Sequence, residues 1–166
     1  VVVIGGMGKW VMTVPEGITW SIRMSAADNS WYGVTYGNGL FVAVANSGTG
    51  NRVLTSPDGI TWTIRTSAAD NGWLSVTYDN GLFVAVAISG TGNRVMTSPD
   101  GITWVMWSSA ADNGWYGVTD GNGLFVAGAT SGTGNRGMTS PDGMTGAVRT
   151  WTVDRAWGGV ACDDGV

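Results

Sequence analysis

The sequence contains no histidine, a single cysteine and few charged residues, which make up 12% of the chain. Lysine and glutamate occur once each, as Lys9 and Glu16. Without histidine the chain can build neither a Ser/His/Asp or Cys/His nucleophile nor an imidazole-ligated metal site. The lone glutamate leaves only aspartates for paired-carboxylate chemistry. The composition therefore argues against most enzyme mechanisms.

Positive charge and long apolar runs are also scarce. The net charge is −4 and the pI is near 4.4, so no basic stripe is available to neutralise nucleic-acid phosphates. Apolar runs such as 40–45 are far shorter than the roughly 20 residues of a membrane span, and we predict neither a transmembrane helix nor a secretory signal. Cys162 is the only cysteine, and the wealth of Gly, Ser, Thr, Asn and Trp favours an extracellular or secreted setting.

Repetition is what the sequence has in abundance. Similar segments begin every 42 residues at Trp31, Trp73, Trp115 and Trp157, and the 166-residue chain is two residues short of four such units. The units 31–72 and 73–114 differ at nine positions without an insertion. A period near 40 residues predicts a repeat architecture whose units share a core. We expect one domain over 1–166, with units at 31–72, 73–114, 115–156 and, as a split unit, 1–30 plus 157–166.

Each unit offers four short apolar segments separated by turn signals. In the unit 31–72 the segments are WYGVTY, LFVAVA, RVLT and ITWTIR, separated by GNG, SGTGN and SPDG. The last segment alternates, with Ile60, Trp62 and Ile64 facing one way. Asn-Gly and Asp-Gly pairs tolerate the positive φ angles of tight hairpins. Four antiparallel strands at this period are typical of a propeller blade, so we predict an all-β fold, a β-propeller of four four-stranded blades.

The two ends of the chain fall within the same unit of the repeat. Val1 aligns with Ala43 in the second segment of a unit, and Val166 aligns with Leu40, so 157–166 can supply the first strand that 1–30 lacks. We expect this C-terminal strand to pair with the N-terminal strand, close a ring and remove two exposed sheet edges. Two chains that exchange strands into an eight-bladed ring would satisfy the same ends. Both alternatives favour a closed unit over an arbitrary excerpt.

A motif at the third turn of each unit carries a resemblance. TSPDGITW occurs at 55–62 and 97–104, with altered copies TVPEGITW at 13–20 and TSPDGMTG at 139–146. The motif resembles the Asp-box, S-x-D-x-G-x-T-W, of the sialidase or BNR-repeat β-propellers, which implies a hairpin turn remote from any active site. The chemistry agrees, because an Asp side chain can accept hydrogen bonds from its own turn while a Trp covers it. We assign structural Asp-box roles to Asp58, Trp62, Asp100, Trp104 and Asp142.

Sialidase catalysis does not follow from that resemblance. The family's active site implies an arginine cluster, a Tyr nucleophile assisted by Glu, and an Asp acid. Here Glu16 lies inside an altered Asp-box, and the arginines recur with the period, for example at Arg52 and Arg94. Repetition at every blade suits structure or multivalent binding better than one convergent site. We predict no enzymatic activity, no cofactor and no bound metal, and we expect the two terminal blades, which carry Glu16 and Gly146, to be the looser ones.

Polar loops gather on one predicted face of the propeller. Because the strands alternate in direction, the SGTGN and SAADN loops emerge together, and loops on a rigid scaffold are common binding sites. Asp and Asn beside an Arg and an aromatic ring typically hold sugar hydroxyls. The candidate ligand-binding residues are Asn51, Arg52, Asp70, Asn71, Asn93, Arg94, Asp112, Asn113, Asn135 and Arg136. The alternative is that the loop aspartates cap their own turns and bridge neighbouring blades.

Three tryptophans break the repeat and are candidate contact residues. Trp10 and Trp107 stand where other units have Arg, and Trp151 stands where they have Ser. A large side chain in place of a charged one often marks a contact surface, and repacking around a closure blade is the competing explanation.

Two functional hypotheses follow from these patterns. The first is a non-catalytic, multivalent, lectin-like module that recognises a glycan or a cell surface through the loop residues. The second is a structural or assembly propeller with a protein partner, capable of homo-oligomer formation by strand exchange, and with no small-molecule ligand. Neither involves nucleic acid or a membrane span. A third, weaker alternative is a Ca²⁺ site formed by Asp163 and Asp164 or by the loop aspartates, although their spacing offers no EF-hand pattern.

Overall fold

The computed structural model describes residues 2–4, 10–13 and 19–162, and these form β-strands joined by turns, without a helix. No helix that could span a membrane is therefore present in those ranges. In chain order the strands are β1 (Val2–Ile4), β2 (Trp10–Thr13), β3 (Ser21–Met24), β4 (Trp31–Gly37), β5 (Leu40–Ala45), β6 (Val53–Ser56), β7 (Thr63–Arg65), β8 (Trp73–Asp79), β9 (Leu82–Ala87), β10 (Val95–Ser98), β11 (Val105–Trp107), β12 (Trp115–Gly121), β13 (Leu124–Ala129), β14 (Gly137–Ser140) and β15 (Ala147–Arg149).

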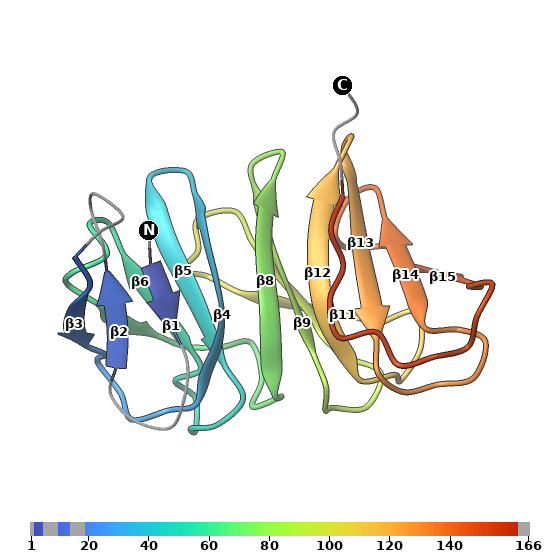
Figure 1. The fold of residues 1–166 in the computed structure, drawn as a ribbon, viewed down its shortest axis with the longest axis horizontal. Helices are drawn as coiled ribbons and strands as arrows, with labels where there is room; N and C mark the ends of the chain where they lie inside the picture. Colours follow the sequence, from blue (N-terminus) through green and yellow to red (C-terminus); the bar gives the residue numbers. More distant parts are fainter. Residues whose placement is uncertain (1, 5–9, 14–18, 163–166) are drawn as a thin grey trace.

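The strands form four antiparallel sheets, each of which follows chain order. β1–β2–β3 is three-stranded, and β4–β7, β8–β11 and β12–β15 are four-stranded. The sheets stand side by side in an arc, with β4, β8 and β12 as adjacent inner strands (Figure 1). This arrangement of repeated antiparallel sheets around inner strands is that of a β-propeller, as the 42-residue period predicts.

The turn residues act as expected, with one correction in the last strand of each unit. Asn38 and Gly39 have φ angles of 49° and 76° and join the Gly37↔Leu40 pair of β4 and β5. Strand β7 begins at Thr63, whereas the alternating pattern predicts a strand from Ile60. Residue 60 belongs to the turn because its N–H is bonded to Asp58, and its side chain is exposed. Local hydrogen bonding overrides the alternating pattern at this point.

The core lies between successive sheets. Trp73 at the start of β8 and Trp104 after the β10–β11 turn belong to one buried cluster with Val42, Val44 and Val53 of the preceding sheet. The cluster between the next two sheets is built the same way around Trp115. Burying a Trp removes roughly 200 Å² of surface from water, worth about 5 kcal/mol. Successive blades therefore stabilise each other through these shared clusters.

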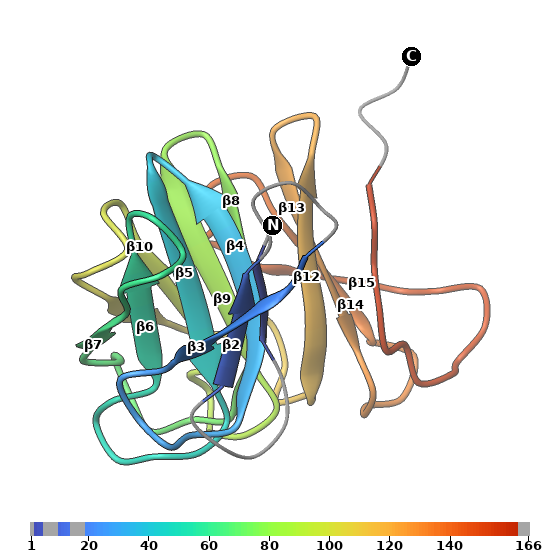
Figure 2. The same cartoon turned by 60° about the vertical axis from the view of Figure 1, so that its left-hand side comes forward.

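The ring is not closed, and the prediction that one chain closes it is wrong for the residues that the structure describes. The β1–β3 sheet and the β12–β15 sheet lie at opposite ends of the arc (Figures 1 and 2). The segment 157–162 lies beside the last sheet: Trp157 N donates to Ala129 O of β13 at 3.1 Å, and Gly159 and Val160 lie next to Gly117 of β12. Ser75 and Val76 of β8 lie next to Gly33 of β4 in the same way, so 157–162 follows the last sheet where a further first strand would lie, without reaching the β1–β3 sheet. The four sheets therefore complete only part of a circle (Figure 1).

Candidate functional site

The polar loops lie together at one end of the sheets, as the strand directions predict. Loops 46–52 and 66–72 are at the same end, opposite the hairpin 37–40 and the turn 56–62 (Figure 1). Equivalent loops recur in the next two sheets at 88–94, 108–114 and 130–136. The candidate ligand-binding residues are therefore brought to one face of the molecule.

The SAADN loops connect neighbouring blades. Asp70 Oδ1 accepts a hydrogen bond of 2.7 Å from Gly50 N in the loop of the preceding sheet. The next residue, Asn71, is buried and donates its amide N–H to Asn93 O at 2.7 Å in the loop of the following sheet. One pair of side chains thus joins two blades. The same pattern recurs 42 residues later, where Asp112 accepts from Gly92 N and Asn113 donates to Asn135 O.

The loop arginines also hold backbone groups. Arg52 Nε donates to Gly48 O at 2.9 Å, and its Nη1 donates to Asn46 O and Asn71 O at 2.9 and 2.8 Å. Its Nε also lies 3.6 Å from Asp70 Oδ1. Arg94 and Arg136 repeat the Nε bond to the equivalent glycine carbonyl. Each of these guanidinium groups therefore uses at least its Nε and one Nη1 donor within the loops.

One glycine in each SGTGN loop makes this packing possible. Gly90 has a φ of 108°, and a Cβ there would lie 2.4 Å from Asn93 Oδ1 and 2.5 Å from Asn71 Nδ2. Only glycine combines this backbone conformation with so little space. The side-chain amides of Asn71 and Asn93 can therefore pack against this loop only because residue 90 has no side chain.

Three aspartate carboxylates remain exposed on the loop face although each lies close to an arginine of the same face. The side chains of Asp70, Asp112 and Asp154 are 42%, 45% and 40% exposed, and each lies within 2.8–3.7 Å of an Arg Nε. Asn71 and Asn113 are buried. The residues that the sequence predicts as a binding site therefore join neighbouring blades. This is the role that the alternative interpretation of the loop aspartates predicts.

The TSPDG turns have the hydrogen bonding that their residues predict. Asp58 Oδ1 accepts from the N–H groups of Ile60 and Thr61, both at 2.8 Å, and from the hydroxyl of Ser56 at 2.9 Å. These bonds, led by that from Thr61, lower the pKa of Asp58 to about 2. Trp62 Nε1 donates to Gly59 O at 3.1 Å. Asp100 and Trp104 repeat this set, and Asp142 repeats it without a Trp.

The tryptophans that break the repeat are largely engaged within the chain. Trp107 Nε1 donates to Thr97 Oγ1 at 2.8 Å, the bond that Arg65 Nε makes to Thr55 in the preceding sheet. Trp151 stacks on Trp157 with ring centroids 5.0 Å apart. A Cβ at residue 137, a Gly where the other blades have Val, would collide with the Trp151 ring. The side chain of Trp10, in β2, lies outside the described residues.

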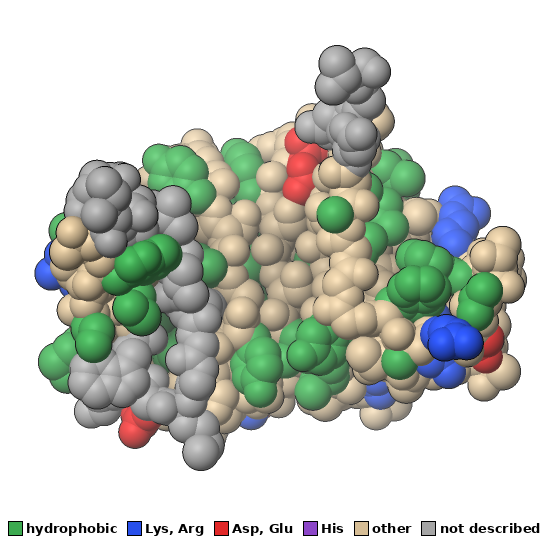
Figure 3. All heavy atoms as spheres, viewed as in Figure 1, with side chains coloured by type: hydrophobic (Ala, Val, Ile, Leu, Met, Phe, Trp, Pro, Cys, Tyr) green, Lys and Arg blue, Asp and Glu red, His purple; other side chains and the backbone are tan. Residues whose placement is uncertain are grey.

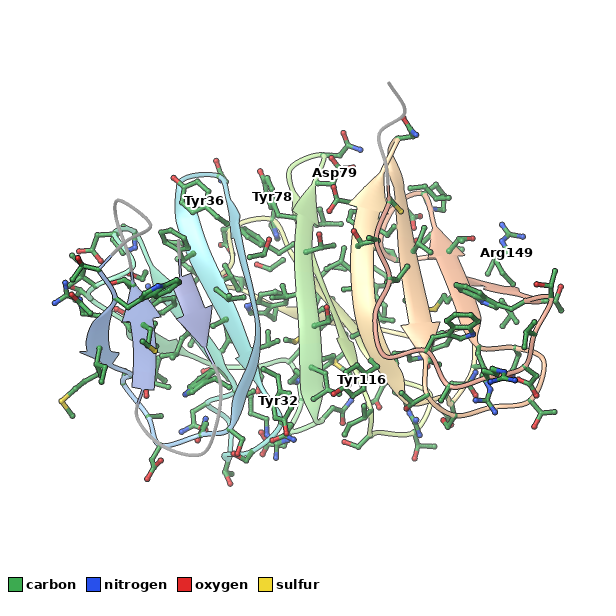
Figure 4. The ribbon with its side chains drawn as sticks, in the orientation of Figure 1. Tyr32, Tyr36, Tyr78, Asp79, Tyr116 and Arg149 are labelled. Carbon is green, nitrogen blue, oxygen red and sulfur yellow. The ribbon has the colours of Figure 1, made fainter. Side chains whose placement is uncertain are left out.

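The inner strands carry exposed tyrosines at both ends, which sequence reasoning missed. Tyr32 and Tyr116 lie at the loop end and are 49% and 40% exposed, whereas Tyr36 lies at the hairpin end and is 57% exposed (Figure 4). Tyr78 also lies at the hairpin end and covers Gly37 of the neighbouring strand (Figure 4). The rings lie at equivalent positions of the repeat. The sequence contains this pattern, but a repeated aromatic residue in a strand is equally typical of the buried core.

A second missed feature is an apolar surface on the first sheet. Met12, Trp20, Ile22 and Met24 are 37%, 41%, 60% and 68% exposed, and we call these four residues the end face. Hydrophobic side chains gather at that end of the arc (Figure 3). The equivalents of the first two, Leu54 and Trp62 in the next blade, are 0% and 7% exposed. The first blade is the one that no preceding sheet covers in the arc (Figure 1).

Metal-binding groups are sparse in the part of the chain that the structure describes. It contains no group of three or more His, Cys, Asp or Glu side chains arranged to hold a metal ion. Asp163 and Asp164, the candidates for Ca²⁺, lie outside the described residues, as does Glu16.

Comparison with known proteins identifies the fold. No protein-family model and no curated protein sequence matches the chain. YCF48, a β-propeller, matches in a structure described as bound to D1 peptide, with a TM-score of 0.67 and 16% identity over 93% of this chain and 51% of that chain. YCF48 from Cyanidioschyzon merolae matches with a TM-score of 0.60 and 14% identity, over 95% and 57%. The computationally designed Ika8 protein matches with a TM-score of 0.57 and 15% identity, over 91% and 48%.

These matches are to structures about twice as long as the region they cover. The chain spans about half the length of each of them. At such identities the likeness shows the fold alone. It agrees with the strand order and the open arc, and the chain is similar to a sector of a β-propeller.

Proposed function

We propose that this chain is a non-catalytic assembly module, a propeller sector whose end face packs against a second copy to complete a ring. The observation that carries the proposal is the exposure of the end face. Trp20 is 41% exposed, whereas Trp62 and Trp104, at the same position of the repeat, are 7% and 8% exposed. The difference is that the later two are covered by a preceding sheet.

The repeat identifies what covers such a face. Trp62 belongs to a buried cluster with Val11 of the preceding sheet and with Leu54. Trp104 is covered in the same way by valines of β5 and β6. The equivalent surface in a second copy is the far side of its β12–β15 sheet, along which 157–162 already lies. Head-to-tail packing of this kind generates a closed ring when the rotation fits.

The comparisons support a role in protein binding. YCF48 is described as bound to D1 peptide, so a protein of this fold holds a polypeptide. The ring hypothesis is consistent with neighbours of about twice the matched length. Membership of the Asp-box propellers is part of the same proposal, supported by the hydrogen bonds of the TSPDG turns. The altered copy of the motif at 13–20 ends in Trp20, which belongs to the end face, so in the first blade the motif itself takes part in the proposed contact.

The mass of the full chain in solution tests the proposal. We expect a dimer at micromolar concentrations, and we expect Ile22→Asp to convert it to a monomer because a carboxylate would be buried in the contact. Ile60→Asp is the matched control, since Ile60 is 47% exposed on a turn and not on the end face. A monomer at every concentration, or equal loss of the dimer in both variants, would contradict the ring hypothesis.

Glycan recognition is the second candidate, and one observation favours it. Tyr32 and Tyr116 expose their rings at the loop end of the sheets (Figure 4). The loops 66–72 and 108–114, which carry the exposed carboxylates of Asp70 and Asp112, lie at that end. Aromatic platforms beside carboxylates suit sugar hydroxyls, and such a lectin-like role belongs with an extracellular setting. A glycan array tests this, with Tyr116→Ala and Asn93→Ala as variants expected to lose signal. Silence across a broad array would exclude it.

A further inference from the structure

The first sheet has an open inner edge. In the complete blades the inner strand pairs with the second strand, as β4 does with β5. Val3 of β1 lies opposite Met12, and Ala43 of β5 lies opposite Leu54, the residue one repeat length after Met12. Strand β1 is therefore the equivalent of β5, with Val3 in the place of Ala43 rather than Val1, as the period alone predicts. Within the described ranges no strand pairs with the other edge of β1, and such an edge is a template for a further strand.

The segment 157–162 has the place and the register of an inner strand. A Cβ at Gly33 of β4 would lie 2.9 Å from Ser75 Cα of the neighbouring inner strand β8. A Cβ at Gly117 of β12 would lie 3.6 Å from Gly159 Cα. Each residue of the second pair is two repeat lengths after its counterpart in the first. Gly159 therefore has the position beside the last sheet that Ser75 has beside the β4–β7 sheet.

This segment pairs with no strand in the part of the chain that the structure describes. Trp157 anchors its start through the bond to Ala129 O and the stacking on Trp151. Residues 158–161 make no backbone hydrogen bond to another described residue, and all but Val160 are exposed. An inner strand without a second strand thus lies at the β12 end of the arc, and a second strand without an inner strand lies at the other end (Figure 1).

We propose that residues 157–162 of one copy supply the inner strand of the β1–β3 sheet of a second copy. This inference rests on the proposed ring and names the contact that joins its two halves. A second copy fits this role because the two ends of the arc lie apart within one chain (Figures 1 and 2). The open edge and the end face belong to the same sheet, so a single docking event covers both.

The pairing of β4 with β5 fixes the register of the proposed contact. The three central pairs of these strands are Gly33↔Val44, Val34↔Ala43 and Thr35↔Val42. The equivalent antiparallel pairs between the two copies are Gly159↔Ile4, Val160↔Val3 and Ala161↔Val2.

Disulfide trapping in the full chain, in a Cys162→Ser background, tests this register. Directly opposite Cα atoms of an antiparallel pair are about 4.5–5.5 Å apart, which a disulfide spans, whereas diagonal positions are about 7–8 Å apart. We expect Ala161→Cys with Val2→Cys to form a covalent dimer on oxidation. Ala161→Cys with Ile4→Cys is the matched control and should form less than about a tenth as much. The mass under denaturing, non-reducing conditions measures both.

The outcomes separate this inference from the ring itself. Equal trapping of both variants, a crosslink within one chain at the monomer mass, or a native dimer in which neither variant is trapped would each overturn the strand exchange. A monomer at every concentration would overturn the ring and the strand exchange together.

Hydrogen exchange of the unaltered chain decides where a cysteine variant does not fold. We expect the strand-paired amides of 159–161 to exchange at least about tenfold more slowly in the dimer than in the monomer obtained by dilution or by Ile22→Asp. Equal exchange rates in dimer and monomer would overturn the strand exchange and leave the end-face contact intact.

Discussion

The blade of β8–β11 and the blade of β12–β15 build the same turn but are coupled differently to their neighbours. Asp100 accepts from two backbone N–H groups, both at 2.8 Å, and Asp142 does so at 2.8 and 2.6 Å. Three residues after the turn glycine, however, the first blade has the buried Trp104 and the second has Gly146.

This difference separates two roles that the motif combines. The aspartate organises its own turn through local bonds, and it does so equally well without the tryptophan. The tryptophan couples one blade to the preceding blade, because it shares a buried cluster with Phe83 of its own blade and with valines of β5 and β6. The TSPDGITW motif therefore combines two separate roles. The aspartate organises the turn, and the tryptophan packs between blades.

Removing the coupling in an interior blade should have the largest effect. We expect Trp104→Ala to lower the free energy of unfolding by about 3–5 kcal/mol, because a large buried side chain is lost and a cavity remains. Ile102→Ala, in the same turn but 42% exposed, is the control and should cost about 0.5 kcal/mol. Urea denaturation of the two variants measures both. Similar losses would show that Trp104 contributes no more than a surface residue of the turn.

The loop junctions should be equally sensitive in both blades, because both use the same glycine. Gly90 and Gly132 have φ angles of 108° and 100°, and a Cβ at either would collide with asparagine side chains. We expect Gly90→Ala and Gly132→Ala each to cost about 3 kcal/mol. Gly92→Ala, which adopts a φ of 69° but meets no atom within 4 Å, should cost only about 1 kcal/mol. A smaller cost at Gly132 than at Gly90 would indicate a looser last blade.

Much of the fold follows from local signals that the sequence states directly. The Asn-Gly pairs fix the hairpins, LFVAVA at 40–45 is β5 without adjustment, and the period fixes the number of strands in the complete blades. The structural roles of Asp58 and Trp62 also follow from their residue types. These predictions succeed because each depends on residues close together in the chain.

The features that the sequence did not predict depend on how the blades are oriented relative to one another. Whether four blades close a ring depends on the angle set by packing between sheets, and no single residue encodes that angle. The exposure of Trp20 has the same cause, since the three residues before it, Gly-Ile-Thr, are the same as those before Trp62. The sequence could not decide the role of Asp70 and Asn71, because the same polar residue types serve either to bind a ligand or to join two loops.

Acid should weaken alike the turn of the β4–β7 blade, which has Trp62, and the turn of the β12–β15 blade, which has Gly146 in that place. The pKa values of Asp58 and Asp142 are about 2 in the folded chain, lowered mainly by backbone N–H groups, against 3.8 ordinarily. The unfolded chain then binds more protons between pH 4 and pH 2, so the stability these carboxylates provide is present above pH 4 and is lost as pH falls through 2. We expect the thermal midpoint to fall over this range, and Asp58→Asn or Asp142→Asn to flatten the fall by similar amounts. A change confined to the blade with Trp62 would contradict the local role of the aspartate.

The smallest effect should come from restoring the repeat at Trp107. Although this Trp replaces a charged residue, its Nε1 makes the bond to Thr97 Oγ1 that Arg65 Nε makes to Thr55, at 2.8 and 2.9 Å. Arg149 makes the equivalent bond to Thr139 in the last blade, also at 2.8 Å. Because donor, acceptor and position are conserved, Trp107→Arg should change the free energy of unfolding by no more than about 0.5 kcal/mol. A loss above about 2 kcal/mol would mean that Trp107 stabilises the chain mainly by packing against the last blade, which would make it a coupling residue like Trp104.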